Sequence, residues 1–285
     1  MEVRDQNLTL QGVADILGVH YVTVYRYVTN GQLLATKVGG LWQVTRHDLD
    51  EFISSAAERK NRRHGLPDAR RTGNYVVELE RCLSNGDSAG AWMVLRRSMN
   101  AGASVEHVIL EIVVPVMSTI GTRWANGEID IAVEHQASAI MSKLIGRLSE
   151  QATRAGRHRG SVLIGGPTGE RHALVLAMLS CLLSLQGWDV LDLGPDTPAS
   201  AFVHAAQRMD RLVAVGVSVT STESFPEVGA TLSVLREKIG HDVPVILGGG
   251  AIQDAEHARK LGADHFAVGS RGFIDFLDGL TKESA

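Results

Sequence analysis

The segment from residue 160 to 282 alternates short apolar runs with helical patterns, and this alternation constrains the fold more than any other feature. Strands are expected over 161–166, 189–194, 212–219, 244–247 and 265–269, and helices over 172–186, 198–209, 225–239 and 255–261. Strands that are apolar throughout and separated by helices are typical of parallel sheets buried on both faces. The sequence therefore predicts an α/β doubly wound parallel sheet.

Polar residues and glycines gather where three of these strands end. Glu170 and His172 follow the first strand, Ser218 and Thr220 end the third, and residues 248–250 are three glycines that end the fourth. Ligands of open parallel sheets bind beyond the carboxyl ends of the strands. We therefore expect a binding site at this edge, with His172 exposed at its mouth.

A polar stretch over residues 54–74 divides the chain. Its basic residues are Arg59, Lys60, Arg62, Arg63, Arg70 and Arg71, and it also contains Gly65 and Pro67. We interpret residues 56–73 as a solvated linker, with phosphate contacts as the alternative, because the stretch follows a small module over residues 1–55.

Residues 1–55 have the pattern of a helix-turn-helix followed by a hairpin. The first helix is expected to place Leu10, Val13, Ala14 and Leu17 on one apolar face, and Gly18 ends it. A second helix over 21–28 and a hairpin over 35–45, turning at Gly39-Gly40, follow. Two short helices joined by a tight glycine turn indicate a helix-turn-helix, and the hairpin indicates a wing.

Residues 74–155 are expected to be helical throughout. Two amphipathic segments flank a turn at residues 85–87, and two more follow, with apolar residues recurring at Val108, Ile112, Val116 and Ile120. Four helices joined by short turns predict a four-helix bundle. Trp124 and the pair Glu134-His135 lie within it, and on the bundle pattern alone they are an ordinary core residue and an ordinary solvated pair.

Composition limits the remaining possibilities. The chain has 285 residues, a net charge of -4 and two cysteines, Cys82 and Cys181, which match no zinc or disulfide framework. The sequence shows no run of about 18 apolar residues and no signal peptide pattern, so we expect a cytoplasmic protein with no membrane partner. It also shows no catalytic triad, hydrolytic metal motif or phosphate-binding loop, so an enzyme is not expected.

Residues 1–55 resemble the excisionase-type, MerR-like winged helix-turn-helix over the whole module. The resemblance implies that the second helix enters the major groove of double-stranded DNA. The contact residues it implies are His20, Tyr21, Thr23, Arg26 and Tyr27 in that helix and Lys37 in the wing. The wing tip over 39–43 lacks the arginines common in this family, which implies a weaker hold on phosphate. A winged helix used for protein contacts is the alternative.

Residues 160–282 resemble the cobalamin-binding Rossmann-like domain, whose pattern is Asp-x-His-x-x-Gly, then Ser-x-Leu or Ser-x-Thr, then Gly-Gly. The corresponding residues are Glu170, His172 and Val175, then Ser218 and Thr220, then Gly248 and Gly249. The bundle resembles the cap domain of the same proteins. Trp124, followed by nine residues and Glu134-His135, resembles the cap signature of the light-responsive, MerR-type cobalamin repressors of the CarH group.

The resemblance implies cobalamin, in its adenosyl form, as the cofactor. His172 would ligate the cobalt, and Glu170 would accept the other ring proton. Ser218, Thr220, Gly248 and Gly249 would hold the cofactor tail, and Trp124, Glu134 and His135 would cover the upper ligand. Two residues depart from the pattern, because Val175 replaces a glycine and Ala125 stands where several members carry a histidine.

The leading interpretation is a transcriptional regulator that senses a corrinoid, with light as the candidate signal, and acts as a homo-oligomer, either a dimer or a tetramer. One alternative is the same scaffold sensing another ligand or a protein partner without cobalamin. A second is a corrinoid carrier for methyl transfer, against which the DNA-binding module argues.

Overall fold

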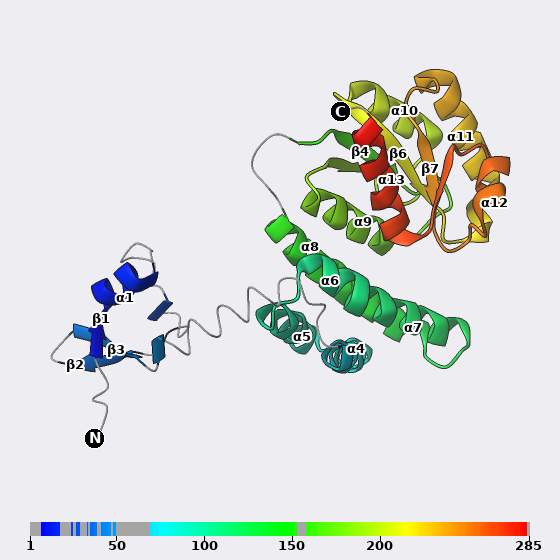
Figure 1. Cartoon of the computed structure of the whole chain (residues 1–285). Coiled ribbons are helices and arrows are strands. Elements are labelled where there is room, and N and C mark those ends of the chain that lie inside the picture. The colour runs from blue at the N-terminus through cyan, green and yellow to red at the C-terminus, as the bar shows by residue number, and fades with distance from the viewer. Residues whose placement is uncertain are drawn as a thin grey trace. The chain divides into compact units, whose positions relative to one another are not determined.

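The computed structural model describes residues 7–17, 24, 27–28, 33, 35–38, 41–46, 48–49, 69–152 and 158–283. The chain divides into two compact units, Met1–Arg71 and Thr72–Ala285, each of which is described by itself. Figure 1 shows the helices and strands of both units.

The first unit contains a three-stranded antiparallel sheet and a helix on one small core. β1 (Asn7–Thr9) leads directly into α1 (Leu10–Leu17), and β2 (Thr36–Val38) and β3 (Leu41–Thr45) form the expected hairpin. The strand order is β1-β3-β2. The buried core residues are Leu10, Val13, Ala14, Val24, Val28, Leu33, Val44 and Leu49. The helix predicted over 10–17 and its apolar face are thus confirmed at the positions that the structure describes.

β1 is an element that the sequence analysis did not anticipate. It pairs with β3 so that Leu8 lies opposite Val44. Three residues are too few to show the period-two alternation by which a strand is recognised. The pairing closes the small sheet on the side of β3 that β2 does not cover.

The predicted DNA-contact residues are only partly covered by the structure. His20, Tyr21, Thr23 and Arg26 lie outside the described residues. Tyr27 is partly buried against the core, and the backbone of Lys37 lies on β2 opposite Trp42. The second helix of the predicted winged helix-turn-helix, which would enter the DNA groove, therefore stays a prediction.

The second unit begins with the four-helix bundle that the sequence predicts. Its helices are α4 (Ala69–Ser84), α5 (Ser88–Asn100), a continuous third helix and α8 (Ile131–Ala152). The third helix consists of α6 (Val105–His107), a π-helical segment η1 (Val108–Val113) and α7 (Val114–Ala125). Its predicted apolar face is confirmed, since Val108, Ile112, Val116 and Ile120 have no exposed surface.

Side-chain caps define where two bundle helices begin. Asp87 accepts a hydrogen bond from the backbone of Gly90 at 2.8 Å, and Ser104 accepts one from the backbone of His107 at 3.0 Å. These caps satisfy backbone groups that the first turn of a helix leaves free. The turn expected at residues 85–87 is confirmed, since α4 ends at Ser84 and α5 begins at Ser88.

The linker expected over residues 56–73 is shorter than the sequence indicated. α4 begins at Ala69, inside that stretch. Arginine is a good helix former, so the basic residues at the end of the stretch are compatible with a helical first turn as well as with a solvated loop. Composition alone did not distinguish the two.

The helix Val105–Ala125 is long and apolar enough to cross a membrane, judged by length and composition only. In the structure its buried side chains, among them Ile109 and Val113, form the centre of the bundle core. Core helices of proteins that cross no membrane have the same composition, so this helix is weak evidence for a membrane span.

The rest of the second unit is a five-stranded parallel sheet. Its strands are β4 (Ser161–Gly165), β5 (Asp189–Asp192), β6 (Leu212–Ser218), β7 (Val245–Gly248) and β8 (His265–Ala267), in the order β5-β4-β6-β7-β8. All of the neighbouring pairs are parallel. The prediction of a doubly wound sheet is confirmed, and its topological switch point lies between β4 and β6.

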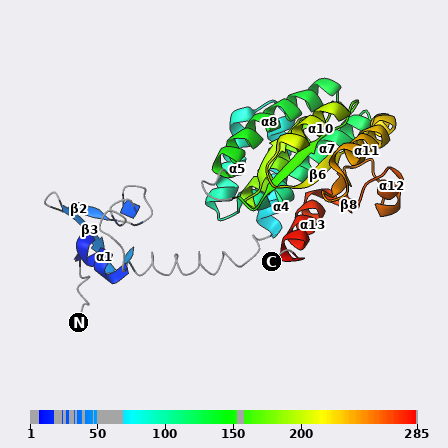
Figure 2. The same cartoon turned by 90° about the horizontal axis from the view of Figure 1, so that it is seen from above.

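Helices cover both faces of the sheet (Figure 2). α9 (Ala173–Leu185) and α13 (Gly269–Glu283) lie on one face, and α10 (Ala199–Arg208), α11 (Phe225–Ile239) and α12 (Ala255–Lys260) lie on the other. A short 3-10 turn, η2 (Thr222–Ser224), precedes α11. Because α8 packs on α9, the bundle core and the core under α9 are continuous. The bundle is thereby packed against α9, on one face of the sheet.

Candidate functional site

The structure brings Glu170, His172 and Thr220 together at the switch point of the sheet. Glu170 and His172 lie in the loop between β4 and α9, and Thr220 follows β6. Since β4 and β6 are neighbours, the loops at their carboxyl ends meet. His172 directly precedes α9 as its N-cap residue, and its side chain makes no capping hydrogen bond to that helix.

Glu170 is the centre of this cluster, and it has no exposed surface. Its Oε1 lies 2.5 Å from Nδ1 of His172, 2.9 Å from the backbone nitrogen of His172 and 2.7 Å from the hydroxyl of Thr220. Its Oε2 accepts hydrogen bonds from the backbone nitrogens of Thr220 and Ser221 at 2.5 and 3.2 Å. Both carboxylate oxygens are therefore satisfied, as a buried charge requires.

The contact with Glu170 decides which ring nitrogen of His172 is available. Nδ1 lies against the carboxylate, and the Thr220 hydroxyl also lies 2.5 Å from it. Nε2 is then the nitrogen that remains for a ligand, on a side chain that is 53% exposed. A carboxylate on one ring nitrogen orients the ring and raises the basicity of the other, which is how metal-ligating histidines are supported.

The same hydrogen bonds shift both ionisations. Burial raises the pKa of Glu170, but the hydrogen bonds from His172 and Thr220 more than offset it and lower that pKa to about 2. The hydrogen bond to Glu170 raises the pKa of His172 against the opposing effect of burial, and the charges of Glu170 and Glu134 raise it further. Glu134 belongs to the bundle, so the two halves of the second unit interact electrostatically at this imidazole.

A second loop braces the segment that carries Glu170 and His172. The carboxylate of Asp196 accepts a hydrogen bond from the backbone nitrogen of Gly169 at 2.8 Å, and the backbone nitrogen of Asp196 donates to the carbonyl of Glu170 at 2.8 Å. Asp196 has a φ of 53°, a left-handed conformation that few residues other than glycine, asparagine and aspartate adopt readily. No sequence pattern singled out Asp196, although it lies just past the expected second strand.

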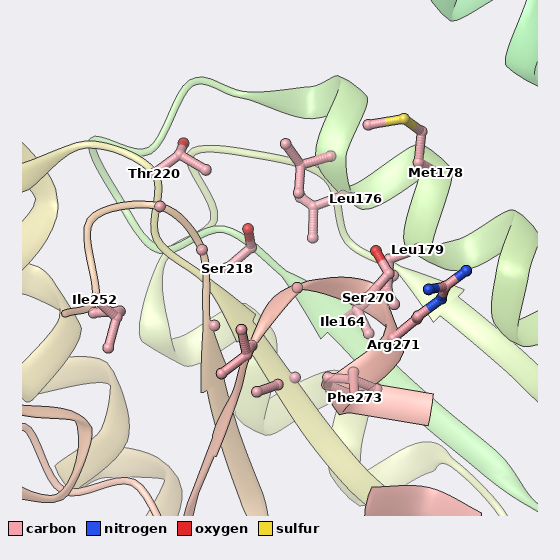
Figure 3. A pocket seen from close by; sticks show the side chains of 18 of the residues that line it. Ile164, Leu176, Met178, Leu179, Ser218, Thr220, Ile252, Ser270, Arg271 and Phe273 are labelled. Carbon is pink, nitrogen blue, oxygen red and sulfur yellow. The ribbon is translucent and has the colours of Figure 1, made fainter. Parts of the chain in front are cut away.

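A pocket of about 660 Å³ lies beside the cluster, over the carboxyl ends of β4, β6 and β7 (Figure 3). The predicted site residues that line it are Val175, Ser218, Thr220, Gly248 and Gly249. Its other walls are Leu176, Met178 and Leu179 of α9, Phe273 of α13, and Leu110, Glu111 and Val114 of the bundle. The volume lies in the range of small-molecule and cofactor sites.

The two motif glycines have structural reasons that do not involve a ligand. Gly249 has a φ of 110°, and a Cβ atom there would lie 2.2 Å from the carbonyl oxygen of Val219. A Cβ atom at Gly248 would lie 3.3 Å from the carbonyl oxygen of Ala267. The two glycines therefore allow the backbone to lie close to Val219 and Ala267. Because neither glycine has a side chain, the end of β7 stays open toward the pocket.

Two other motif residues, Val175 and Thr220, have surroundings that the structure defines. Val175 is partly buried in the first turn of α9, and it lines the pocket without filling it. The Thr220 hydroxyl, expected to bond the cofactor tail, instead bonds Glu170 at 2.7 Å. Ser218 is then the motif hydroxyl that faces the pocket with no such local bond to Glu170.

The predicted upper-face residues lie at facing ends of two bundle helices. Trp124 is in the last turn of α7 and is 42% exposed, an unusual exposure for so large an apolar side chain. Glu134 and His135 are in the first turn of α8, where Glu134 bonds His135 and Ser138, each at 2.6 Å. These residues do not line the pocket that borders Ser218, and Glu134 is the one that acts on His172.

The arrangement fits a metal held mainly by its own macrocycle. Among the described residues, no group of three or more His, Cys, Asp or Glu side chains forms a site for a bare metal ion. A corrinoid would bring most of its metal ligands with it, and His172, held by Glu170 through Nδ1, would supply a nitrogen ligand from the protein. The pocket, which Ser218 and Thr220 line, would hold another part of such a cofactor.

Comparison with protein families assigns each part of the chain. Residues 76–149 and residues 160–272 each match a family described as a B12 binding domain. Residues 8–57 match a helix-turn-helix domain. The four-helix bundle (the B12-binding bundle) and the Rossmann-like sheet (the B12-binding sheet domain) each match such a family model, and the predicted fold of both is confirmed.

Two curated relatives are similar to different lengths of this chain. A corrinoid protein of Desulfitobacterium hafniense is 23% identical over 198 residues, which cover 68% of this chain and 91% of that protein. The HTH-type transcriptional repressor CarH of Myxococcus xanthus is 32% identical over 142 residues, 50% of this chain and 46% of the repressor. This chain thus aligns with just under half the length of the repressor.

Solved structures support the fold of the B12-binding parts. The monomethylamine corrinoid protein of Methanosarcina barkeri has a TM-score of 0.62 and 19% sequence identity, over 72% of this chain and 98% of that one. At this identity the likeness concerns the fold of the bundle and sheet domain.

Proposed function

We propose that the protein is a DNA-binding transcriptional regulator that senses a corrinoid through its B12-binding bundle and B12-binding sheet domain. The observation that carries this proposal is the pairing of Glu170 with Nδ1 of His172, at 2.5 Å, beside a pocket of about 660 Å³. The helix-turn-helix match at residues 8–57 adds the output domain. The regulator is cytoplasmic and has no catalytic activity of its own.

Each site residue has a role that follows from its contacts. Nε2 of His172 would hold the cobalt of the corrinoid, since an imidazole nitrogen is a suitable ligand for that metal. Glu170 keeps the ring in the required tautomer, and Thr220 holds Glu170. Ser218 and the backbone at Gly248 and Gly249 contact the cofactor tail. Val175 narrows the approach to this pocket without closing it.

The bundle senses the upper axial group. Trp124 offers a flat, exposed apolar surface at the end of α7, and Glu134 and His135 offer polar atoms at the start of α8. An adenosyl group has an aromatic base and hydroxyls that suit both. We propose adenosylcobalamin as the ligand and the light-driven loss of its adenosyl group as the signal. A dimer or tetramer that binds paired half-sites in DNA would transmit this signal.

Two alternatives have support of their own. Relatives named dimethylamine corrinoid protein, such as the one from Methanosarcina barkeri at 25% identity over 153 residues, favour a corrinoid carrier for methyl transfer. A scaffold that senses another ligand or a protein partner is favoured by Val175, which stands where the B12 motif has glycine. The helix-turn-helix match distinguishes the proposed regulator from the carrier.

The proposal is tested by ligand binding and DNA binding in one preparation. Purified protein is titrated with adenosylcobalamin in the dark, and DNA fragments from its own promoter region are then tested by gel shift before and after illumination. We expect a base-off, histidine-bound spectrum and DNA binding that changes with light. Removal of residues 1–55 should abolish DNA binding, and Arg26→Ala should weaken it by about 1–3 kcal/mol. A protein that binds neither corrinoid nor DNA refutes the proposal.

A further inference from the structure

An ion pair between the B12-binding bundle and the B12-binding sheet domain lies at the wall of the pocket. Nη2 of Arg271 lies 2.6 Å from Oε1 of Glu111. Arg271 is in the first turn of α13 on the sheet domain, and Glu111 is in the π-helical segment η1 of the bundle. Both residues line the pocket. The pair therefore joins the bundle to the sheet domain at the place where a cofactor tail would enter.

These two residues are the charged groups of an otherwise neutral pocket. Among the described residues that line it, Glu111 is the one acid and Arg271 the one base, and the rest are apolar side chains, glycines, hydroxyls and Gln253. Figure 3 shows Arg271 beside Ser270, on the side of the pocket where α9 contributes Met178 and Leu179. An anionic ligand group that enters this pocket has one cation available to it.

The ion pair between Arg271 and Glu111 can be broken at little cost in stability. The Arg271 side chain is 67% exposed and that of Glu111 40%, and exposed ion pairs contribute little to stability. A guanidinium binds a phosphodiester at least as well as a carboxylate, because its planar donors match both anions. Glu111 also lies in a π-helical segment, a local irregularity that often marks a functional position.

We infer that Arg271 binds the phosphodiester of the corrinoid nucleotide tail, and that this phosphodiester displaces Glu111. The inference rests on the proposed function, and it names the chemical group by which the site distinguishes complete corrinoids from tailless ones. Entry of the tail breaks the Arg271–Glu111 pair, so occupation of the pocket is coupled to release of one contact between the bundle and the sheet domain. Glu111 thus acts as an internal competitor for the cofactor.

The test compares three corrinoids that carry the same upper ligand and differ in the tail. Cobalamin has the full nucleotide tail, cobinamide phosphate keeps the phosphate without the base, and cobinamide has neither. Dissociation constants for the full-length protein are measured by titration calorimetry in the dark. In Arg271→Gln the affinities for cobalamin and cobinamide phosphate should fall by about tenfold, because a charge-assisted hydrogen bond is lost. The affinity for cobinamide should stay within about twofold of the wild-type value.

The sign of the effect at Glu111 separates this role from a structural one. In Glu111→Gln the affinity for cobalamin should rise by about threefold or more, because Arg271 no longer has to leave a carboxylate before it binds the tail. If the pair merely holds the two domains together, both variants change binding in the same direction and for all three corrinoids. That result overturns the inference, as does an unchanged ratio of cobalamin to cobinamide affinity in Arg271→Gln.

A matched control removes a cation from an exposed pair elsewhere. Lys260 pairs with Glu256 on α12 at 2.8 Å, and neither residue lines the pocket. Lys260→Gln should leave all three affinities within about twofold of the wild type. If the wild type binds cobalamin with a histidine-bound spectrum and Arg271→Gln behaves as Lys260→Gln does, the inference alone fails. If the wild type binds none of the three corrinoids, the proposed function fails with it.

Discussion

Oε1 of Glu170 lies 2.5 Å from Nδ1 of His172, and the carboxylate is fully buried while the imidazole is about half exposed. A buried carboxylate that holds an exposed imidazole by one nitrogen presents the other nitrogen in a fixed direction. The hydroxyl of Thr220, from the next strand of the sheet, bonds the same carboxylate oxygen at 2.7 Å.

Replacing His172 should remove the axial nitrogen. We expect His172→Ala to abolish the histidine-bound absorption spectrum and to weaken corrinoid binding by at least about tenfold. The exposed His241, which lies outside the site, provides the control, since His241→Ala should leave the spectrum unchanged. An unaltered spectrum in His172→Ala would show that another group ligates the cobalt.

The pKa of His172 should govern how ligation depends on pH. The hydrogen bond to Glu170 raises the pKa of His172 above 6.5, and only the neutral imidazole binds a metal. Ligation should therefore strengthen as pH rises through this raised pKa and weaken as pH falls below it. In Glu170→Gln the midpoint of a spectroscopic pH titration should move to lower pH. A midpoint that stays in place or rises in this variant contradicts the assignment.

The same two pKa shifts both stabilise the ligand-free protein, but their contributions depend on pH in opposite directions. The raised pKa of His172 stabilises the fold below its unfolded pKa, and this contribution is lost as pH rises through the folded value. The pKa of Glu170, lowered from 4.5 to about 2, stabilises the fold above pH 4.5, and this contribution is lost as pH falls toward 2. Urea unfolding of the wild type and Glu170→Gln should differ less at pH 3 than at pH 7.

Asp196 should position the histidine loop. Asp196→Gly removes the bond to Gly169 but tolerates a φ of 53°, so it tests the side chain without adding backbone strain. We expect it to destabilise the loop by about 1 kcal/mol and to lower the histidine-bound fraction of the corrinoid spectrum. Asp196→Asn keeps an acceptor and should restore most of that fraction. Equal fractions in the wild type and both variants would exclude a positioning role.

Val175 should limit access to the pocket. Val175→Gly and Val175→Ala both remove side-chain volume from the wall, and both should bind cobalamin more tightly than the wild type. The comparison is needed because glycine in a helix costs about 1 kcal/mol of stability relative to alanine. Calorimetry that gives equal or weaker affinity for both variants would show that the valine is accommodated without crowding.

Trp124 should select the upper ligand. Trp124→Ala is expected to leave corrinoid binding in place and to reduce the preference for adenosylcobalamin over methylcobalamin, because the exposed ring is lost. Met93, an exposed residue of α5 in the same bundle, provides the control variant Met93→Ala. A preference unchanged in Trp124→Ala, measured by calorimetry in the dark, would assign the tryptophan to bundle packing alone.

The sequence by itself determined the architecture and the edge of the sheet that carries the site. Fully apolar strands separated by helices are compatible with few arrangements other than a covered parallel sheet, and such sheets bind ligands at their carboxyl ends. The helix Phe225–Ile239 was predicted over the residues that the structure gives it. Glu170 and His172 were recognisable as a pair because they are two residues apart, so their relation is local.

The tertiary structure decided the contacts between residues that are distant in the chain. Thr220 reaches Glu170 because β4 and β6 are neighbours, Asp196 reaches Gly169 from the loop after β5, and Arg271 pairs with Glu111 across 160 positions. No local pattern encodes such contacts, since they depend on strand order and on how the bundle packs against the sheet domain. Periodicity reports which face of an element is buried, whereas the fold decides which polar side chains at the ends of those elements meet.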